Sequence, residues 1–360
     1  MSLAIKINGQ EYTNFQNASV ILSIAAVTRG FSFVSTANEN NTFPVKIGDI
    51  VEVSADYIDV LEGYIEVLDI SYDSGSHEIR VGGRSKMADL VDSSMPTQFE
   101  VKGTSLEAIA SSVLLSIGLP NRVENQAGVI RNFDDISSSE IGQNAFGFLE
   151  KYSRKRQVLL TSDGFETLVL TRAGVDKAPA KLKNIKGAED NNILSADLSL
   201  DYTERFYRYI AKSQLNTSTP GFNSTPEELS DQEGEVFDDD IRGTRRLEFN
   251  AEESMESFSA KDRATWEKNL RIGTGLEYRA KVVGNSVNGR LWLPNTIVEI
   301  EDELCQLEEE LLIKEVRYNF SINGGSTTDL IMIRKSAFTL DLEQSEREAN
   351  AKKADKEWVV

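Results

Sequence analysis

The sequence is poor in the residues that most often carry chemistry. It has one cysteine, Cys305, and one histidine, His77, in 360 residues. One thiol cannot form an internal disulfide, and one cysteine with one histidine cannot form a conventional structural zinc site. No G-x-S-x-G elbow is present that could pair the histidine with a nucleophile. We therefore interpret Cys305 as a structural thiol and His77 as an incidental residue at the start of a strand.

Long apolar runs are also missing. No segment approaches the roughly 20 apolar residues that are needed to cross a bilayer. The start, MSLAIKINGQEY, alternates apolar and polar residues, whereas a signal peptide has a basic stretch, a solid apolar block and a small-residue cleavage site. These absences predict a protein that is made and kept in a cytoplasm, without membrane insertion.

Basic residues are few compared with acidic ones. The chain has 39 Lys and Arg against 58 Asp and Glu, a formal net charge of −19. Such a surface repels the phosphate backbone of nucleic acid. Two explanations of this acidity stay open. One is solubility alone, and the other is a surface that must not bind nucleic acid. With 40% hydrophobic residues the chain is globular, and its length predicts two or three domains at about 150 residues each.

Residues 1–96 have the two-residue period of β-strands. Apolar residues alternate with polar ones at Val20, Leu22 and Ile24, at Phe31 and Phe33, at Val51 and Val53, at Ile65 and Val67, and at Ile79 and Val81. Asn8-Gly9 is the dipeptide that best supplies the positive φ values of a tight hairpin. Short strands at this spacing predict a small barrel or a sandwich.

Residues 97–175 change to a helical period and predict a compact α/β domain. Thr104 and Glu107 have the spacing of a capping box, and Gly118 ends the helix that follows. A second helix is predicted from Ser138. Its inward-facing residues are expected to be Ile141, Ala145, Phe148, Leu149 and Tyr152. The segment RKRQVLLTSDGFETLVLT then predicts two apolar strands joined by a turn.

Strand patterning returns at 176–212 and again at 283–342, which predicts a second β-domain interrupted by an insertion. Residues 213–282 form this insertion of loop and helix. Its tract at 216–243 is rich in Ser, Thr, Pro, Gly and acidic residues, and such a tract cannot bury enough apolar surface to be rigid. A helix is predicted around Ala260–Leu270.

The C-terminal tail, 343–360, is polar and charged. It has helical propensity but little apolar face to dock, so we expect it to fray or to need a partner.

The acidic runs do not define a site. Glu233–Asp240 lacks the ligand spacing and the twelfth-position glutamate of an EF-hand, so it is interpreted as a solvated loop. Glu301–Glu303 and Glu308–Glu310 contain enough carboxylates for a glycosidase. That chemistry needs two carboxylates held across a cleft, however, and adjacent glutamates in a strand point to different faces. The runs are therefore interpreted as a charged rim.

Two further motifs are weighed in the same way. The run Gly82-Gly83-Arg84-Ser85 is too short for a phosphate loop and lacks the Walker lysine, which favours a strand ending that needs permissive backbone. The basic run Arg154–Arg156 ends the second predicted helix, where cations complement the helix dipole. No catalytic, cofactor-binding or metal site is predicted.

Several phrases together resemble the Mu-type contractile phage or prophage baseplate hub family, also called the 43-kDa tail protein family. They are Gly63-Tyr64-Ile65, Val81–Lys86 (VGGRSK), Asp89–Ser94 (DLVDSS), Arg156–Thr161 (RQVLLT) with Leu168–Thr171 (LVLT), Glu204-Arg205-Phe206, Leu291–Asn295 (LWLPN) and Leu311–Ile313 (LLI). Their order and spacing across about residues 1–340 carry the resemblance. The tract at 216–243 and the tail match no phrase.

The resemblance implies a multidomain α+β, β-rich fold: two small antiparallel β-barrels plus α/β domains, in a ring-shaped trimer. The first barrel would be residues 1–96, and the second 176–212 with 283–342. The implied function is a structural baseplate hub, not an enzyme, that adapts the six-fold tail tube to the three-fold central spike. The chain would form a homotrimer, and its partners would be the spike, the tube and other baseplate proteins. The virion would be assembled in the host cytoplasm.

DNA would pass through the ring without specific binding, and we hypothesise an acidic channel lining. Two alternatives remain. One is the base module of a type VI secretion-like spike, although the β-helical needle typical of that class is not seen in the sequence. The other is a tail-associated peptidoglycan hydrolase.

Overall fold

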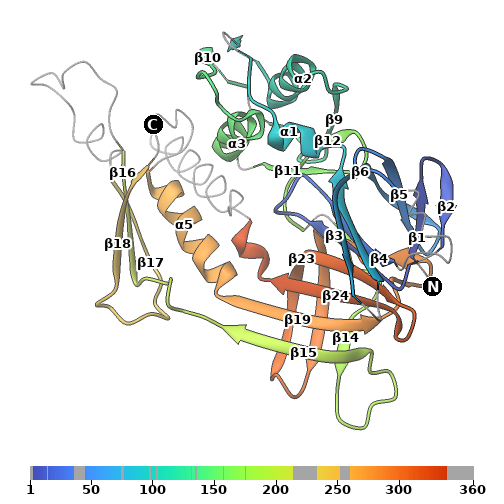
Figure 1. Cartoon of the computed structure of the whole chain (residues 1–360). Coiled ribbons are helices and arrows are strands. Elements are labelled where there is room, and N and C mark those ends of the chain that lie inside the picture. The colour runs from blue at the N-terminus through green and yellow to red at the C-terminus, as the bar shows by residue number, and fades with distance from the viewer. Residues whose placement is uncertain are drawn as a thin grey trace, which may run out of the picture. The chain divides into compact units, whose positions relative to one another are not determined.

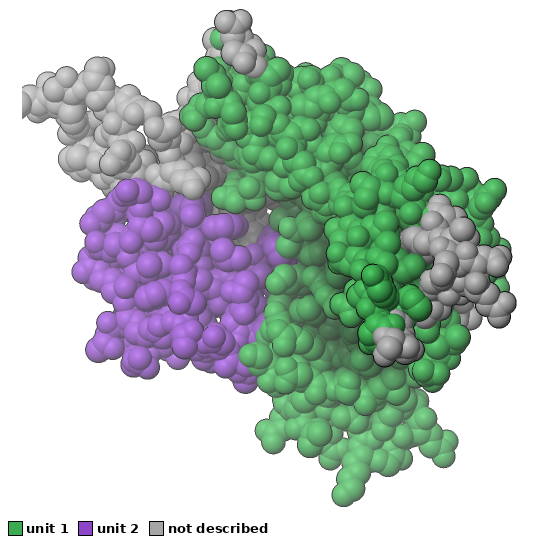
Figure 2. All heavy atoms as spheres, viewed as in Figure 1, with its two compact units in different colours: residues 1–199, 277–333 green, residues 200–276, 334–360 purple. Residues whose placement is uncertain are grey.

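The structure is a computed structural model. It describes residues 3–13, 15–35, 45–73, 77–96, 99–102, 104–130, 132–133, 136–156, 158–174, 176–213, 233–251 and 260–338. The expectations for residues 216–232 and for the charged tail lie outside these residues. The chain divides into two compact units, coloured separately in Figure 2: residues 1–199 with 277–333, and residues 200–276 with 334–360.

The first unit is built on one 14-stranded sheet, seen in Figure 1. Its strands are β1 (Leu3–Ile7), β2 (Gln10–Tyr12), β3 (Asn17–Ser23), β4 (Gly30–Ser35), β5 (Ile50–Ala55), β6 (Ile58–Tyr72), β7 (His77–Ser85), β13 (Asp176–Lys177), β14 (Leu182–Asn184), β15 (Ile193–Leu200), β19 (Leu276–Val283), β22 (Thr296–Asp302), β23 (Leu307–Ser321) and β24 (Gly325–Ile333). A separate small hairpin consists of β20 (Ser286–Val287) and β21 (Arg290–Leu291).

The predicted alternation is present and builds the core. Val20, Leu22 and Phe33 are buried on one side of β3 and β4, while their neighbours are less buried. Asn8 and Gly9 both have positive φ, as a two-residue hairpin requires. This confirms the predicted turn between β1 and β2.

The two β-regions are joined rather than separate. Strands run in the order β15-β19-β24-β23-β3-β4-β7-β6-β5-β1-β2, with β22 added beside β23, and β13 and β14 added beside β22. The join is an antiparallel ladder in which residues 17–23 of β3 pair with residues 315–321 of β23. Among the described strands, no ladder closes either half of the sheet into a complete barrel.

The two halves of the sheet repeat one pattern. In the first half the order is β3-β4-β7-β6-β5, and in the second it is β15-β19-β24-β23-β22. The long strands β6 and β23 both contain 15 residues and both pair with a nine-residue strand. Each of these ladders shifts register at one point, at Ile65/Val67 and at Ile313/Glu315. Glu66 and Lys314 are the extra residues at these two bulges, so they occupy equivalent positions. The other residues of β6 and β23 can be matched one by one from there.

An α/β segment follows the first β-region. It contains α1 (Ala88–Asp92), β8 (Glu100–Lys102), α2 (Leu106–Ser116), β9 (Arg122–Asn125), β10 (Ile136–Ser138), α3 (Ala145–Arg156), β11 (Leu159–Ser162) and β12 (Thr167–Thr171). One apolar cluster, which includes Leu114, Phe148 and Leu170, packs the helices on the three-stranded sheet β11-β12-β9. The predicted strand pair is confirmed as the antiparallel β11–β12 ladder.

Two details of the predicted helices are wrong. Ser105, not Thr104, caps α2, because its hydroxyl accepts from the backbone N–H of Ala108 at 3.2 Å. Helix α3 begins at Ala145 rather than at Ser138, and Ile141 is exposed in the turn before it. Asn144 stops the helix from starting earlier, because its side chain accepts from the backbone N–H of Gly147 as a cap.

The second unit contains a three-stranded sheet and a helix. Its elements are β16 (Arg208–Ser213), β17 (Glu233–Phe237), β18 (Arg246–Ala251), α5 (Ala260–Thr274) and the 3₁₀ turn η1 (Lys335–Ala337). Helix α5 confirms the predicted helix. The loop predicted at 233–237 is wrong: Tyr209 of β16 pairs with Val236 of β17, and both are buried. Sequence reasoning missed this strand because only one of its five residues, Val236, is strongly apolar and buried.

Candidate assembly surface and junctions

The glycines of the GGRS phrase permit close strand contact. A Cβ on Gly83 would lie 2.0 Å from the carbonyl oxygen of Tyr64 and 2.7 Å from the ring of Phe31. A Cβ on Gly63 would lie 1.9 Å from the carbonyl oxygen of Arg84. Neither glycine has a positive φ. The permissive backbone predicted here is therefore a matter of space between β6 and β7 and not of backbone dihedral.

Arg84 connects the strand to the helix that follows. Its guanidinium contacts Glu66 at 2.7 Å and Asp92 at 2.6 Å. These hydrogen bonds, to Glu66 first and then to Asp92, raise the pKa of Arg84, and the same contact lowers the pKa of Asp92. The phrases GRS and DLVD are thus two ends of one ion-pair network across the β7–α1 turn.

Arg29 joins the first β-region to the α/β segment. Its guanidinium donates to the carbonyl oxygens of Val60 at 2.6 Å and Ser162 at 3.1 Å. Its backbone N–H donates to the Ser85 hydroxyl at 3.0 Å. Gly164, at φ +90°, lies so close that a Cβ there would meet the Val60 carbonyl at 2.3 Å. The predicted turn of RKRQVLLTSDG is therefore the point where the α/β segment docks on the first β-region.

Asn295 of the LWLPN phrase ties down the chain between β12 and β13. Its side chain accepts from Gly174 N–H at 2.8 Å and donates to the carbonyl of Arg172 at 2.9 Å. It has φ +65°, a region that asparagine tolerates better than most residues. Trp292 is buried, and its carbonyl accepts a hydrogen bond from the Tyr318 hydroxyl.

Arg205 of the ERF phrase is the buried charge of the second unit. Its guanidinium makes two 2.9 Å hydrogen bonds to Asp238 and one of 3.0 Å to Asp240. The side chains of Arg205 and Asp238 are only 2% and 3% exposed. The acidic run Glu233–Asp240 is therefore not simply a solvated loop, because its last residues neutralise a buried arginine.

The other acidic runs also have structural partners. Asp302 is buried and accepts hydrogen bonds from the Tyr278 hydroxyl at 2.6 Å and from Asn184 at 3.1 Å. Glu301 contacts Lys181 at 2.7 Å, and Glu310 contacts Lys177 at 3.4 Å. These contacts fit the predicted charged rim on the ladder of β22 and β23, apart from Asp302, which lies inside.

The remaining candidates stay apart from one another. His77 stacks on Tyr72 across the β6–β7 ladder, and half-buried Cys305 has a pKa raised by its burial. Arg154 pairs with Glu150 at 2.7 Å, while Arg156 donates to the carbonyl of Asn132.

Within the described ranges, no group of three or more His, Cys, Asp or Glu side chains could hold a metal ion. No described helix is long and apolar enough to cross a membrane.

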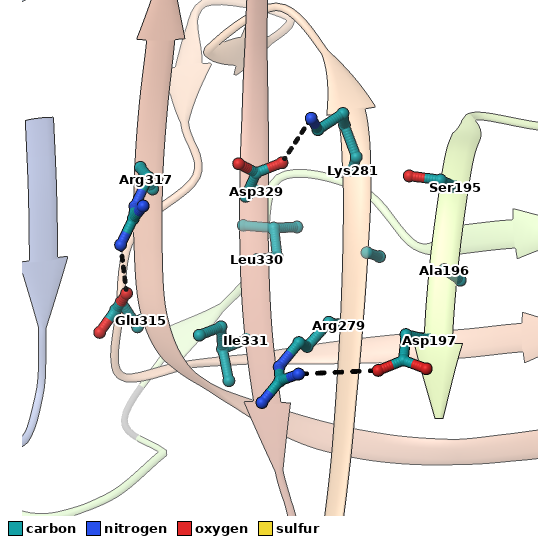
Figure 3. A pocket seen from close by; sticks show the side chains of 11 residues that line it. Ser195, Ala196, Asp197, Arg279, Lys281, Glu315, Arg317, Asp329, Leu330 and Ile331 are labelled. Atoms are coloured by element: carbon teal, nitrogen blue, oxygen red, sulfur yellow. Dashed lines mark ion pairs between the residues drawn. The ribbon is translucent and has the colours of Figure 1, made fainter. Parts of the chain in front are cut away.

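A charged hollow of about 360 Å³ lies on one face of β15, β19, β24 and β23 (Figure 3). Three ion pairs line it: Arg279–Asp197 at 3.6 Å, Lys281–Asp329 at 3.4 Å and Arg317–Glu315 at 3.8 Å. Acidic and basic groups are equal in number. The charged groups that line the hollow therefore carry no excess of either sign.

Sequence reasoning did not single out Arg29 or Tyr278, and it placed Asp302 in the exposed charged rim rather than in the core. The signal for Asp302 was present, since it follows the alternating apolar residues Val298 and Ile300 and shares their buried face. Arg29 has no such signal, because its partners are main-chain carbonyls more than 30 residues away.

Comparison with known proteins adds three matches along the chain. Residues 2–85 match the "Mu phage baseplate assembly protein GpP-like, N-terminal" family, residues 87–172 the "Baseplate hub protein gp44-like, second domain" family, and residues 256–341 the "Mu phage baseplate assembly protein GpP, fourth domain" family.

Whole-chain relatives agree. The baseplate hub protein gp44 of Escherichia phage Mu is 24% identical over 367 residues, which cover 96% of this chain and 91% of gp44. The crystal structure of the 43 kDa tail protein of prophage MuSo2 from Shewanella oneidensis is similar with a TM-score of 0.79 and 26% identity, over 94% of this chain and 100% of that one.

The fold also extends to secretion machinery. A component of the E. coli type VI secretion system, described as structurally similar to T4 bacteriophage tail proteins gp27 and gp5, has a TM-score of 0.55 at 10% identity, over 92% of this chain and 76% of that one. These findings define a β-rich phage tail protein of the baseplate. The chain belongs to the Mu-type baseplate hub family.

Proposed function

We propose that this chain is a structural, non-enzymatic baseplate hub that assembles as a ring of three copies. The observation that carries the proposal is the match to phage Mu gp44 over 96% of the chain. The doubled sheet pattern supports it, since three copies would present six similar β-modules to a six-fold tail tube and three-fold symmetry to a central spike. Tube, spike and other baseplate proteins would be its partners in the virion, which would assemble in the host cytoplasm.

The domain boundaries follow the sequence. Residues 1–96 and residues 176–212 with 283–342 would be the two barrel-like modules, and 97–175 the α/β domain between them. The matched range 87–172 ends close to the second boundary, at 175, whereas it begins about ten residues before the first boundary, at 96. The residues of 213–282 would form an inserted region, and 343–360 a tail.

DNA would pass through the ring without specific binding. The outward face of β15, β19, β24 and β23 is a candidate for the channel wall, because the opposite face is packed into the core. The charged groups that line its hollow are paired one to one, so the hollow gives no support to a strongly acidic lining. A wall without excess positive charge suffices, because phosphate backbones bind to lysine- and arginine-rich surfaces.

The test of ring formation is single-particle imaging of the purified chain. Class averages should show a closed ring with three-fold symmetry, six similar lobes and an open centre. Compact single particles at micromolar concentration would contradict the proposal.

The fold likeness to the type VI component keeps the spike-base alternative. Co-purification with a tail-tube protein from the same genome would favour the phage hub. The hydrolase alternative predicts clearing of purified peptidoglycan, and loss of that clearing on mutation of a carboxylate pair.

A further inference from the structure

The ladder between β3 and β23 shows how one β-module is joined to the next. The first part of β23, residues 307–312, pairs with β22, and residues 315–321 of the same edge pair with β3. The strand β3 thus extends the sheet where β22 ends. On the apolar side of this ladder, Val316 lies opposite Leu22 and Tyr318 lies opposite Val20.

The corresponding edge of the first module is open. The first part of β6, residues 58–64, pairs with β5, as β23 pairs with β22. Beyond the bulge, residues 67–72 pair with β7 on one side, and no described strand lies on the other. The equivalent of β3 in the second module is β15, which ends the sheet beside β19 (Figure 1). Among the described strands, β6 therefore offers an acceptor edge and β15 the corresponding donor strand.

Exposure of equivalent side chains fits edges that no described strand covers. The bulge alignment places Ile70 of β6 at the position of Tyr318 in β23. Ile70 is 61% exposed, whereas Tyr318 is 0% exposed. Tyr72, one step along the same face, is exposed as well. An apolar side chain that is buried at the β3–β23 ladder thus has an exposed equivalent on the open edge of β6.

The register of β15 follows from its neighbour. The hydroxyl groups of Ser19 in β3 and Ser32 in β4 lie 3.0 Å apart. The first residue pair beyond the bulge is Val67–Gly82 in the first module and Glu315–Ile331 in the second. Gly82 pairs on its other side with Ser32 of β4, and Ile331 pairs on its other side with Arg279 of β19. Arg279 is therefore the equivalent of Ser32. Arg279 contacts Asp197 of β15 at 3.6 Å (Figure 3). Asp197 therefore takes the place of Ser19.

This register sets the apolar residues of β15. Leu198 then corresponds to Val20 and Leu200 to Leu22. Leu200 is 57% exposed, whereas Leu22 is 0% exposed. The donor strand thus has the same unburied apolar face as the acceptor edge.

We propose that β15 of one copy adds as an antiparallel strand to residues 67–72 of β6 in the next copy and so repeats the β3–β23 ladder between chains. This inference rests on the proposed ring and names the edges that close it. Leu68 would lie opposite Leu200 of the next copy, Ile70 opposite Leu198 and Ser71 opposite Asp197. Such a contact is head-to-tail, and head-to-tail contacts close into a ring when the rotation allows it. It also covers edges that would otherwise invite aggregation.

Paired cysteines test the ladder. In a Cys305→Ser background, Ser71→Cys with Asp197→Cys should be joined between copies by a short bis-maleimide, because directly opposed residues have Cβ atoms about 5 Å apart. Most of the chain should then run as covalent dimers and trimers on a denaturing gel, whereas either single variant should stay monomeric. The matched control is Glu11→Cys with Asp197→Cys, since Glu11 lies on β2 at the opposite end of the sheet.

The outcomes separate this inference from the ring itself. A trimeric mass with Ser71–Asp197 cross-links supports both. A trimeric mass without these cross-links, or with efficient Glu11–Asp197 cross-links instead, overturns the ladder and leaves the ring standing. A monomeric mass overturns both. As a second measurement, Ile70→Asp should dissociate the assembly, while Val129→Asp, at an apolar residue that is also exposed but lies outside the large sheet, should not. An intact trimer with Ile70→Asp would contradict the ladder.

Discussion

The hydroxyl of Tyr278 donates a 2.6 Å hydrogen bond to the carboxylate of Asp302, and both side chains are buried. Burial first, and the hydrogen bond to Asp302 second, raise the pKa of Tyr278 well above its ordinary value. For Asp302, burial by itself raises the pKa. The hydrogen bonds from Tyr278 and from Cys305 outweigh it, so the pKa of Asp302 is lowered overall. The pair links β19 to the end of β22.

This relationship predicts two limits of pH stability. Tyr278 has a raised pKa in the folded chain, so its contribution is complete below the unfolded pKa of about 10 and is lost as pH rises above it. Asp302 has a lowered pKa, so its contribution is present above about pH 3.9 and is lost as pH falls through the lower folded value. Tyr278→Phe should reduce both dependences and lower stability at neutral pH by about 1.5–3 kcal/mol. Urea unfolding from pH 3 to pH 11 measures this, and an unchanged profile in Tyr278→Phe would contradict it.

Arg205→Ala should destabilise the second unit strongly. It leaves the carboxylate of Asp238 buried without its partner, which costs about 3–5 kcal/mol. Arg246→Ala is the control, because that side chain is half exposed and surface ion pairs contribute about 0–1 kcal/mol. Urea denaturation followed by circular dichroism compares the two. Equal losses would show that the Arg205–Asp238 pair is not the stabilising contact.

Gly83→Ala should be destabilising and Gly82→Ala nearly neutral. The added methyl at Gly83 would lie 2.0 Å from the Tyr64 carbonyl, whereas at Gly82 the nearest atom, on Val67, is 3.7 Å away. Overpacking of this kind costs about 1–3 kcal/mol. Thermal unfolding of the two neighbouring variants checks the difference. If both variants melt together, the close β6–β7 approach is not as described.

Asn295→Gly should retain more stability than Asn295→Ala. Both lose the side-chain hydrogen bonds to Arg172 and Gly174, but only alanine also pays for the left-handed backbone at φ +65°. The difference should be about 1–2 kcal/mol. Chemical denaturation of the pair provides the measurement, and a glycine variant less stable than the alanine variant would argue against it.

Local patterns predicted much of the fold because the physical signal was local. The β1–β2 turn needs only Asn8-Gly9, and the helix at Ala260 needs only its own propensity and spacing. Both are found as expected. The start of α3 was misplaced because Ile141 fits a helical face, although the cap contributed by Asn144 begins the helix later.

What sequence patterns did not reveal depends on distant partners. The β3–β23 ladder joins residues almost 300 positions apart, and no periodicity in either strand indicates its neighbour. The same holds for Arg29, whose partners are carbonyl oxygens on other elements. Strand β17 was taken for a loop because its acidic residues suit solvent, while the buried arginine that neutralises Asp238 lies 33 positions earlier.

The most direct test of the central claim is the molar mass of the purified chain by light scattering coupled to size-exclusion chromatography. A hub that forms its own ring should elute with a mass near three times the 40.0 kDa of one chain, unchanged over a tenfold dilution. A stable 40.0 kDa monomer at high concentration would contradict it.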